Sequence, residues 1–173
     1  MVPVILGVLI ALFINNWKDE RDDERYLIRV MGSIDKEIQD NINEIDFVLS
    51  KQMALIDTLH HYIDDDEIFA IHILKKAKGL QSPTISNTMW QSMLNSKIEL
   101  LDYEIIAILS EIDEHRQVFN MKLSKIMELD FENTRTNPTY SKNVLKNNIA
   151  NLIDSEKALL DLQNKYLELR SKK

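Results

Sequence analysis

The 173 residues of this chain suffice for one domain, with or without an attached segment, and the formal net charge of −7 disfavours a nucleic acid partner. No cysteine is present, which excludes disulfides, thiol catalysis and cysteine metal ligands. Only three glycines and three prolines are available for turns, so long helices are expected.

The first seventeen residues, MVPVILGVLIALFINNW, carry no charged side chain. As a helix they would be about 25 Å long, slightly less than the roughly 30 Å of a hydrocarbon core. Trp17 and Lys18 are the aromatic and cationic pair typical of a membrane–water interface. We therefore predict a transmembrane anchor over residues 1–17, with Trp17 and Lys18 at the interface, and a helical body over residues 18–173.

Two other interpretations of this stretch are open. A cleaved signal peptide would need a basic front and small residues at a cleavage site, and ALFINNW offers no such site. A buried core helix would be amphipathic, whereas this segment is apolar on every face. The anchor fits better than either.

A long helix is predicted after the anchor. Apolar residues recur every three or four positions, with an average spacing of 3.6, which is typical of one helix face in a bundle. The helix could continue unbroken from the anchor, for about 60 residues or roughly 90 Å. The apolar positions are Leu27, Met31, Ile34, Ile38, Ile42, Ile45, Leu49, Met53, Ile56, Leu59 and Ile63.

Two short helices are predicted next. The acidic run IDDDEIF ends the long helix, and a short one covers residues 67–78 before Gly79 stops it. LQSPTIS reads as a loop. Ser86 is a suitable N-cap for a second short helix over residues 87–94, with Ile85 packing against Trp90 across the cap.

Two more long helices complete the chain. Asp102 caps the first, whose apolar residues have heptad-like spacing. NTRTNPTYS breaks it, because Pro138 cannot continue a helix, and the last helix runs from about residue 141 to 170. We predict an all-α fold in which an N-terminal transmembrane helix continues into an antiparallel bundle of three long and two short helices. The heptad-like residues are Ile105, Leu109, Ile112, Phe119, Leu123 and Ile126.

The histidines are weak candidates for chemistry. His60 and His61 lie near Asp57 and Asp64 at helical spacing, but a metal needs three or four converging ligands, so a solvated helix face fits better. His115 shares an apolar stripe and reads as a core or boundary residue, although it could sense pH.

Other motifs also favour structural roles. The acidic run at residues 64–67 lacks the alternating ligands and central glycine of a calcium loop. Trp90 with Met89 and Met93 could line a ligand pocket, but core packing is favoured. KDERDDER reads as a solvated helix face with local ion pairs such as Lys18 with Asp22. We expect no catalytic, metal-binding or cofactor-binding residue, no cofactor, no small-molecule substrate and no enzymatic activity.

The stretch VILGVLIALFINNWKDERDDERYL resembles the start of an uncharacterised family of single-pass, N-terminally anchored helical membrane proteins common in Bacteroidota. SNTMWQSMLNSKIELLDYEIIAILSEI is a looser second match to that family. The resemblance implies an inner-membrane protein with its bundle on the periplasmic side. The cations after the anchor, Lys18, Arg21, Arg25 and Arg29, argue instead for a cytoplasmic body.

The predicted function is therefore that of an interaction module. We expect a membrane-anchored accessory or scaffold subunit that contacts lipid and either another membrane protein or further copies of itself. The alternative is a membrane-linked sensory module, in which a ligand or partner shifts helix packing and a continuous helix carries the change to the membrane.

Overall fold

The computed structural model describes residues 2–128 and 137–172, and every regular element in these ranges is a helix. The long helices are α1 (Val2–His61), α4 (Tyr103–Met127) and α5 (Pro138–Ser171), and the short ones are α2 (Ala70–Lys76) and α3 (Thr88–Leu94). A single 3-10 turn, η1 (Ile98–Leu100), precedes α4. The predicted all-helical fold is confirmed for these two ranges, which contain three long and two short α-helices.

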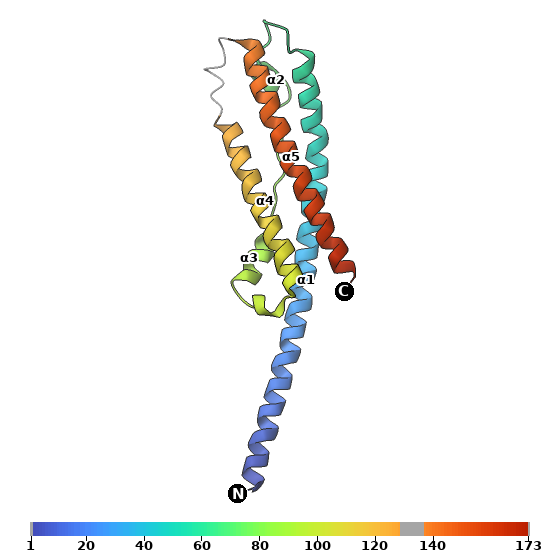
Figure 1. The fold of residues 1–173 in the computed structure, drawn as a ribbon, viewed down its shortest axis with the longest axis vertical. Coiled ribbons are helices and arrows are strands. Elements are labelled where there is room, and N and C mark those ends of the chain that lie inside the picture. The colour runs from blue at the N-terminus through green and yellow to red at the C-terminus, as the bar shows by residue number, and fades with distance from the viewer. Residues whose placement is uncertain (1, 129–136, 173) are drawn as a thin grey trace.

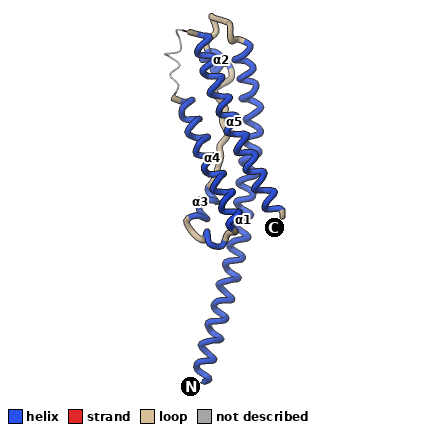
Figure 2. The backbone as a smooth tube through the Cα atoms, viewed as in Figure 1, coloured by secondary structure: helices blue, strands red, loops and turns tan. Residues whose placement is uncertain are grey.

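The bundle is built around α5. This helix packs along both α1 and α4, which make few direct contacts with each other. Figure 1 shows the N-terminal part of α1 extending well beyond the other helices, so that part of α1 lies outside the bundle. The connection between α2 and α3 runs along the bundle, as Figure 2 shows.

Most of the predicted stripe of α1 lies on its buried face, but the buried positions also form a heptad seam that contains polar residues. Asn41 and Gln52 lie inside, whereas Met53, predicted as a stripe residue, is 53% exposed. A 3.6-residue stripe drifts around the helix relative to a 3.5-residue seam, which explains the wrong assignment of Met53. The buried seam residues alternate by three and four positions: Met31, Ile34, Ile38, Asn41, Ile45, Val48, Gln52, Leu55 and Leu59.

The same pattern appears in α5, which supplies the other half of the seam. Its buried positions also include three polar side chains, Lys142, Glu156 and Gln163, each completely buried. Antiparallel heptad packing thus places polar groups of α5 between two helices. The seam of α5 consists of Lys142, Leu145, Ile149, Leu152, Glu156, Leu159, Gln163 and Tyr166.

The predicted loop after α2 is an extended segment fixed to α1, here called the connecting segment (residues 80–87). Gln52 Nε2 donates to the Gln81 carbonyl (3.0 Å), and Asn41 exchanges two hydrogen bonds with the backbone of Ser86 (2.8 and 2.9 Å). Eleven helical residues at about 1.5 Å each and five extended residues at about 3.3 Å each both span about 16 Å. The stretch of α1 from Asn41 to Gln52 and the stretch of the connecting segment from Gln81 to Ser86 are therefore equally long. This equal length lets both amide side chains bond to the connecting segment.

The start of α3 differs from the sequence prediction. Asn87, not Ser86, is the N-cap residue, and Glu37 of α1 accepts hydrogen bonds from the backbone N–H groups of Thr88 (2.9 Å) and Met89 (3.1 Å). The Ser86 hydroxyl also donates to Glu37. A carboxylate from a distant helix thus satisfies the first turn of α3, a role that local capping rules assign to a neighbouring residue.

The last helix begins earlier than predicted. Pro138 is the first residue of α5, and the side chain of Asn137 accepts a hydrogen bond from the Tyr140 N–H (2.9 Å). Proline ends a helix when it lies inside one, but it suits the first turn, where its missing N–H has no helical acceptor. The predicted break also includes residues 133–136, which lie outside the described residues.

The end of α1 is held by a buried lysine. Lys142 Nζ donates to the carbonyls of Tyr62 and Asp65, just beyond the last helical residue. A cation at this position binds two carbonyls of the turn that follows the helix and complements the negative end of the helix dipole. The acidic run is a turn, in which Asp65 accepts a hydrogen bond from the backbone N–H of Glu67 (2.9 Å).

Candidate interaction site

The part of α1 outside the bundle has an unpartnered apolar surface, here called the projecting segment (residues 5–17). The large apolar side chains described in it are between 52% and 74% exposed and cover about two thirds of the helix circumference, while Gly7, Ala11 and Asn15 share the remaining face. A helix that is apolar all round is normally covered by a protein core or by lipid. The exposed side chains are Ile5, Val8, Leu9, Ile10, Leu12, Phe13, Ile14 and Trp17.

The predicted transmembrane helix is not supported by the described residues. No helix there is both long enough and apolar enough to cross a membrane. Residues 2–17 rise only about 24 Å at about 1.5 Å per residue. Asn15, Asn16 and the charged residues from Lys18 onward end the apolar run before it reaches a full span.

The predicted interface residues occupy the polar end of this surface. Trp17 is half exposed, and the Arg21 guanidinium carbon lies 5.0 Å from the centroid of its ring. Lys18 is exposed on the next position. The predicted pairing of Lys18 with Asp22 is wrong, since Asp22 pairs with Arg25 one turn further on.

Contacts from the loop after α3 hold α1 where it enters the bundle. The Lys97 ammonium pairs with Asp23, and the hydrogen bond from Lys97 to Asp23 raises the pKa of Lys97. The Tyr26 hydroxyl lies 2.8 Å from the Ser96 hydroxyl. These contacts define the base of the bundle, and the projecting segment lies on the N-terminal side of them.

A second group of contacts to α1 lies two to three turns further along this helix. Asp35 accepts hydrogen bonds from the buried Tyr166 hydroxyl (2.6 Å) and from two nitrogens of Arg170 (both 3.1 Å). Burial, followed by the hydrogen bond to Asp35, raises the pKa of Tyr166. The hydrogen bond to Asp35 likewise raises the pKa of Arg170. These hydrogen bonds join α1 to α5 near the base of the bundle.

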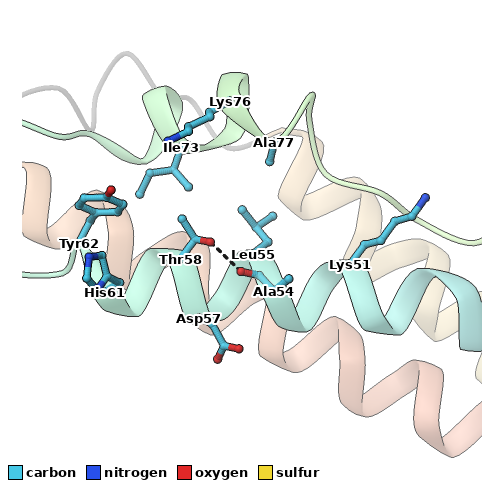
Figure 3. A pocket seen from close by; sticks show the side chains of 10 residues that line it. All are labelled: Lys51, Ala54, Leu55, Asp57, Thr58, His61, Tyr62, Ile73, Lys76 and Ala77. Carbon is cyan, nitrogen blue, oxygen red and sulfur yellow. Dashed lines mark hydrogen bonds between the residues drawn. The ribbon is translucent and has the colours of Figure 1, made fainter.

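The histidines and acids singled out from the sequence do not converge. His60 and His61 are exposed, and Figure 3 shows Asp57 pointing away from α2. No cluster of three or more potential ligands is placed to hold a metal ion within residues 2–128 and 137–172. His115 is half-buried on α4.

The groove in Figure 3 lies between α1 and α2 and measures about 520 Å³. Leu55 points into it from α1 and Ile73 from α2, and His61 lies at one end beside the Tyr62 ring, with the two ring centroids 4.7 Å apart. Thr58 donates its hydroxyl to the Ala54 carbonyl of its own helix (2.8 Å). The groove is open, and its polar side chains do not converge on one point.

The Trp90 cluster belongs to the core, as favoured from the sequence. Trp90 is 3% exposed and Met93 is completely buried, while Met89 is half-buried against the same cluster. The helix that carries them, α3, packs against α1. Trp90 therefore fills the base of the bundle.

Sequence reasoning missed one polar pair in the core. Glu156 is completely buried, and its carboxylate accepts a hydrogen bond of 2.8 Å from Gln52 of α1. Burial raises the pKa of Glu156 from 4.5 to about 7, and the hydrogen bond from Gln52 opposes that rise. The heptad spacing of Lys142, Glu156 and Gln163 in α5 was the available signal, because it places all three on one face.

Comparison with protein-family models, curated proteins and solved structures finds no match to this chain. Its function is therefore inferred from the fold and from the geometry of the exposed and buried side chains.

Proposed function

We propose that this protein is a membrane-anchored accessory or scaffold subunit that acts through protein–protein interaction. In this proposal the projecting segment is held in lipid, with Trp17 and Lys18 at the interface, and the bundle binds a partner outside the membrane. The observation that carries it is the apolar surface of residues 5–17, which the other described residues leave uncovered.

The short length of the apolar run is consistent with a partner inside the membrane. A hydrocarbon region of about 24 Å is less than the roughly 30 Å of a typical bilayer, a mismatch that local thinning or helix association relieves. A Cβ atom added at Gly7 would meet nothing within 4 Å, so this face is open to a second helix. We propose another membrane protein, or a second copy of this chain, as that partner.

The inner membrane, with the bundle on the periplasmic side, is the proposed location. Support for it comes from the resemblance of the first segment to single-pass inner-membrane proteins. The cations that follow Trp17 favour the opposite orientation. Protease protection in closed and opened cells would distinguish the two, because only a periplasmic bundle is cut when the outer membrane alone is opened.

The test of membrane attachment is a pair of substitutions in the full chain. Leu9→Lys with Phe13→Lys places two charges in the middle of the projecting segment, at about 2.5–3.5 kcal/mol each in hydrocarbon. We expect the native chain to float with membranes after an alkaline wash and the double variant to remain in the aqueous fraction. Both sites are more than half exposed, so the unfolding midpoint of the bundle should not change.

Met121→Lys is the matched control, because Met121 is 56% exposed on α4 and lies in the bundle. It should leave flotation unchanged. If the native chain stays in the aqueous fraction, or if the double variant still floats, the projecting segment does not enter lipid and the proposal is wrong.

A membrane-linked sensory module is the second candidate, favoured by the continuity of α1. This helix is unbroken from the projecting segment to the far end of the bundle, over 60 residues. A change in core packing could therefore reach the projecting segment through one rigid element. Light scattering on detergent-solubilised protein would favour the scaffold if it showed a stable assembly independent of pH and ligand.

A further inference from the structure

The pair formed by Gln52 and Glu156 has a hydrogen-bonding pattern that requires explanation. Gln52 is 1% exposed and Glu156 is completely buried. Gln52 Nε2 donates both of its hydrogens, one to Glu156 Oε1 (2.8 Å) and one to the Gln81 carbonyl (3.0 Å). The amide nitrogen therefore has no further donor to offer.

Two acceptor atoms of the same pair lack a donor. Gln52 Oε1 and Glu156 Oε2 are buried without a hydrogen-bond partner among the described residues. Buried polar atoms of this kind cost roughly 1–3 kcal/mol each when unpaired. The two groups are already joined through their other atoms, so one donor between them would satisfy both acceptors.

A proton supplies that donor. A carboxylic acid at Glu156 would donate its O–H to Gln52 Oε1, while Gln52 Nε2 continued to donate to Glu156 Oε1. The result is a ring of two hydrogen bonds between a neutral acid and a neutral amide. An ionised carboxylate, in contrast, has only acceptors and leaves both atoms unpaired.

The surroundings favour the neutral form. One turn away on either side, Val48 and Leu55 of α1 are buried and apolar, as are Leu152 and Leu159 on α5. Burial is the largest cause of the raised pKa of Glu156, to about 7, and the opposing cause is the hydrogen bond from Gln52. The pKa rise therefore comes from removal of water and not from a nearby charge.

The charged groups around the pair are directed elsewhere. From α4, Lys122 donates to the Asn151 carbonyl (3.1 Å) and to the Ser155 hydroxyl (2.6 Å), beside Glu156. On α5 itself, Asp154 and Lys157 are exposed.

Two further lysines lie on α1 and in the turn before the connecting segment. Lys51 and Lys78 line, together with Gln52 and Gln81, an open groove of about 350 Å³. The Lys51 ammonium lies 3.7 Å from the centroid of the Phe47 ring. This groove is the route by which water could reach Gln52.

We propose that Gln52 and Glu156 form a proton-binding switch between α1 and α5, closed as an acid–amide pair and opened by ionisation of Glu156. When the proton leaves, the carboxylate requires water or a cation, and the groove beside Gln52 gives access to both. Gln52 also holds the Gln81 carbonyl, so opening loosens the connecting segment and the contact of α1 with α5. The inference does not depend on membrane attachment, and it gives the sensory alternative a specific input.

The sign of the pH dependence follows from linkage. The pKa of Glu156 is raised from 4.5 to about 7 in the folded state, so between these values the folded chain holds a proton that the unfolded chain has lost. Below pH 4.5 the stabilising contribution of Glu156 to the folded state is fully present. It declines as the pH rises and is lost above about pH 7. Over this interval the folding equilibrium constant falls by up to about 300-fold on account of this one group.

The test compares the native chain with Glu156→Gln in urea unfolding from pH 4.5 to pH 8.5. A glutamine at position 156 donates its own N–H to Gln52 Oε1, so the variant keeps the closed ring at every pH. We expect the native chain and Glu156→Gln to be equally stable near pH 4.5. At pH 8 we expect the folding equilibrium constant of the variant to exceed that of the native chain by a factor of about 10 to 100. Both chains contain the same four histidines, so the effect of histidine titration on stability cancels when their pH profiles are subtracted.

Asp154→Asn, an exposed site on the same helix, is the control and should leave the pH profile unchanged. Titration of the Glu156 carboxyl carbon by NMR in the native chain tests the proposal even if the variant does not fold. A midpoint well above 4.5 supports the switch, and faster amide exchange of residues 80–87 at pH 8 than in Glu156→Gln supports its opening. A midpoint near 4.5, or parallel pH profiles of the two chains, overturns it.

Discussion

Replacing Gln163 by leucine should stabilise the protein, although it removes a polar group from the seam of the bundle. Gln163 is completely buried, and neither its amide oxygen nor its amide nitrogen has a partner among the described residues. Its seam position on α5 is seven residues after Glu156, and its neighbours Leu159 and Tyr166 on that seam are also completely buried. Leucine has nearly the same volume as glutamine.

The expected gain follows from the cost of burying an unpaired amide. Mutational data put this cost at about 1–3 kcal/mol, whereas a buried leucine keeps the packing and adds apolar contact. We expect the free energy of unfolding of Gln163→Leu to rise by about 1–3 kcal/mol. For a chain of this size that corresponds to an increase in Tm of several degrees.

Gln52→Leu is the matched comparison, because it makes the same chemical change at the other buried glutamine. Gln52 donates to Glu156 and to the Gln81 carbonyl, so leucine leaves a buried carboxylate oxygen and a partly buried carbonyl without this donor. We expect a loss of about 2–4 kcal/mol, at roughly 1–3 kcal/mol for each unpaired group. The two substitutions should therefore change stability in opposite directions.

Urea unfolding at a single pH, followed by far-ultraviolet circular dichroism, measures both effects. The slope with urea should stay constant, so that a changed midpoint reports stability alone. If Gln163→Leu destabilises the chain by about 1 kcal/mol or more, the Gln163 amide has a partner in the folded protein and the reasoning from unpaired groups is refuted at this site.

Three further substitutions test the contacts that join distant segments. Asp35→Ala leaves the buried Tyr166 hydroxyl without its acceptor and should cost about 2–3 kcal/mol in urea unfolding; a cost below about 0.5 kcal/mol would show that another group replaces Asp35. Glu37→Ala should cost about 1–2 kcal/mol and accelerate amide exchange in the first turn of α3, and unchanged exchange there would contradict its capping role. Lys142→Met keeps the apolar stem but removes the donor to two carbonyls beyond α1, so we expect a loss of about 1–3 kcal/mol, checked by the same unfolding assay and contradicted by equal or greater stability.

The helices themselves could be predicted because their signals are local. Apolar residues spaced three or four apart identify α1, α4 and α5, and the scarcity of glycine and proline leaves few places for a chain break. The apolar character of residues 5–17 is likewise a property of adjacent residues. Its exposure in the structure agrees with that pattern, but the sequence argument alone did not exclude a position in the core.

The polar contacts were not predictable because their partners are far apart in the chain. Gln52 and Glu156 are separated by 104 positions, and Asn41 and Ser86 by 45. When the sequence pattern of one helix is considered without its partner helix, glutamine, glutamate and asparagine are assigned to the solvent-facing side. The reason is that an isolated amide or carboxylate favours water.

The sequence by itself determined which stretches are helical and which one is apolar on every face. Only the tertiary structure decided the register in which α1 and α5 meet, because a heptad seam admits a polar residue wherever a partner on the other helix satisfies it. That register brings Glu156 to Gln52, and among the described residues it leaves the large apolar side chains of the projecting segment exposed.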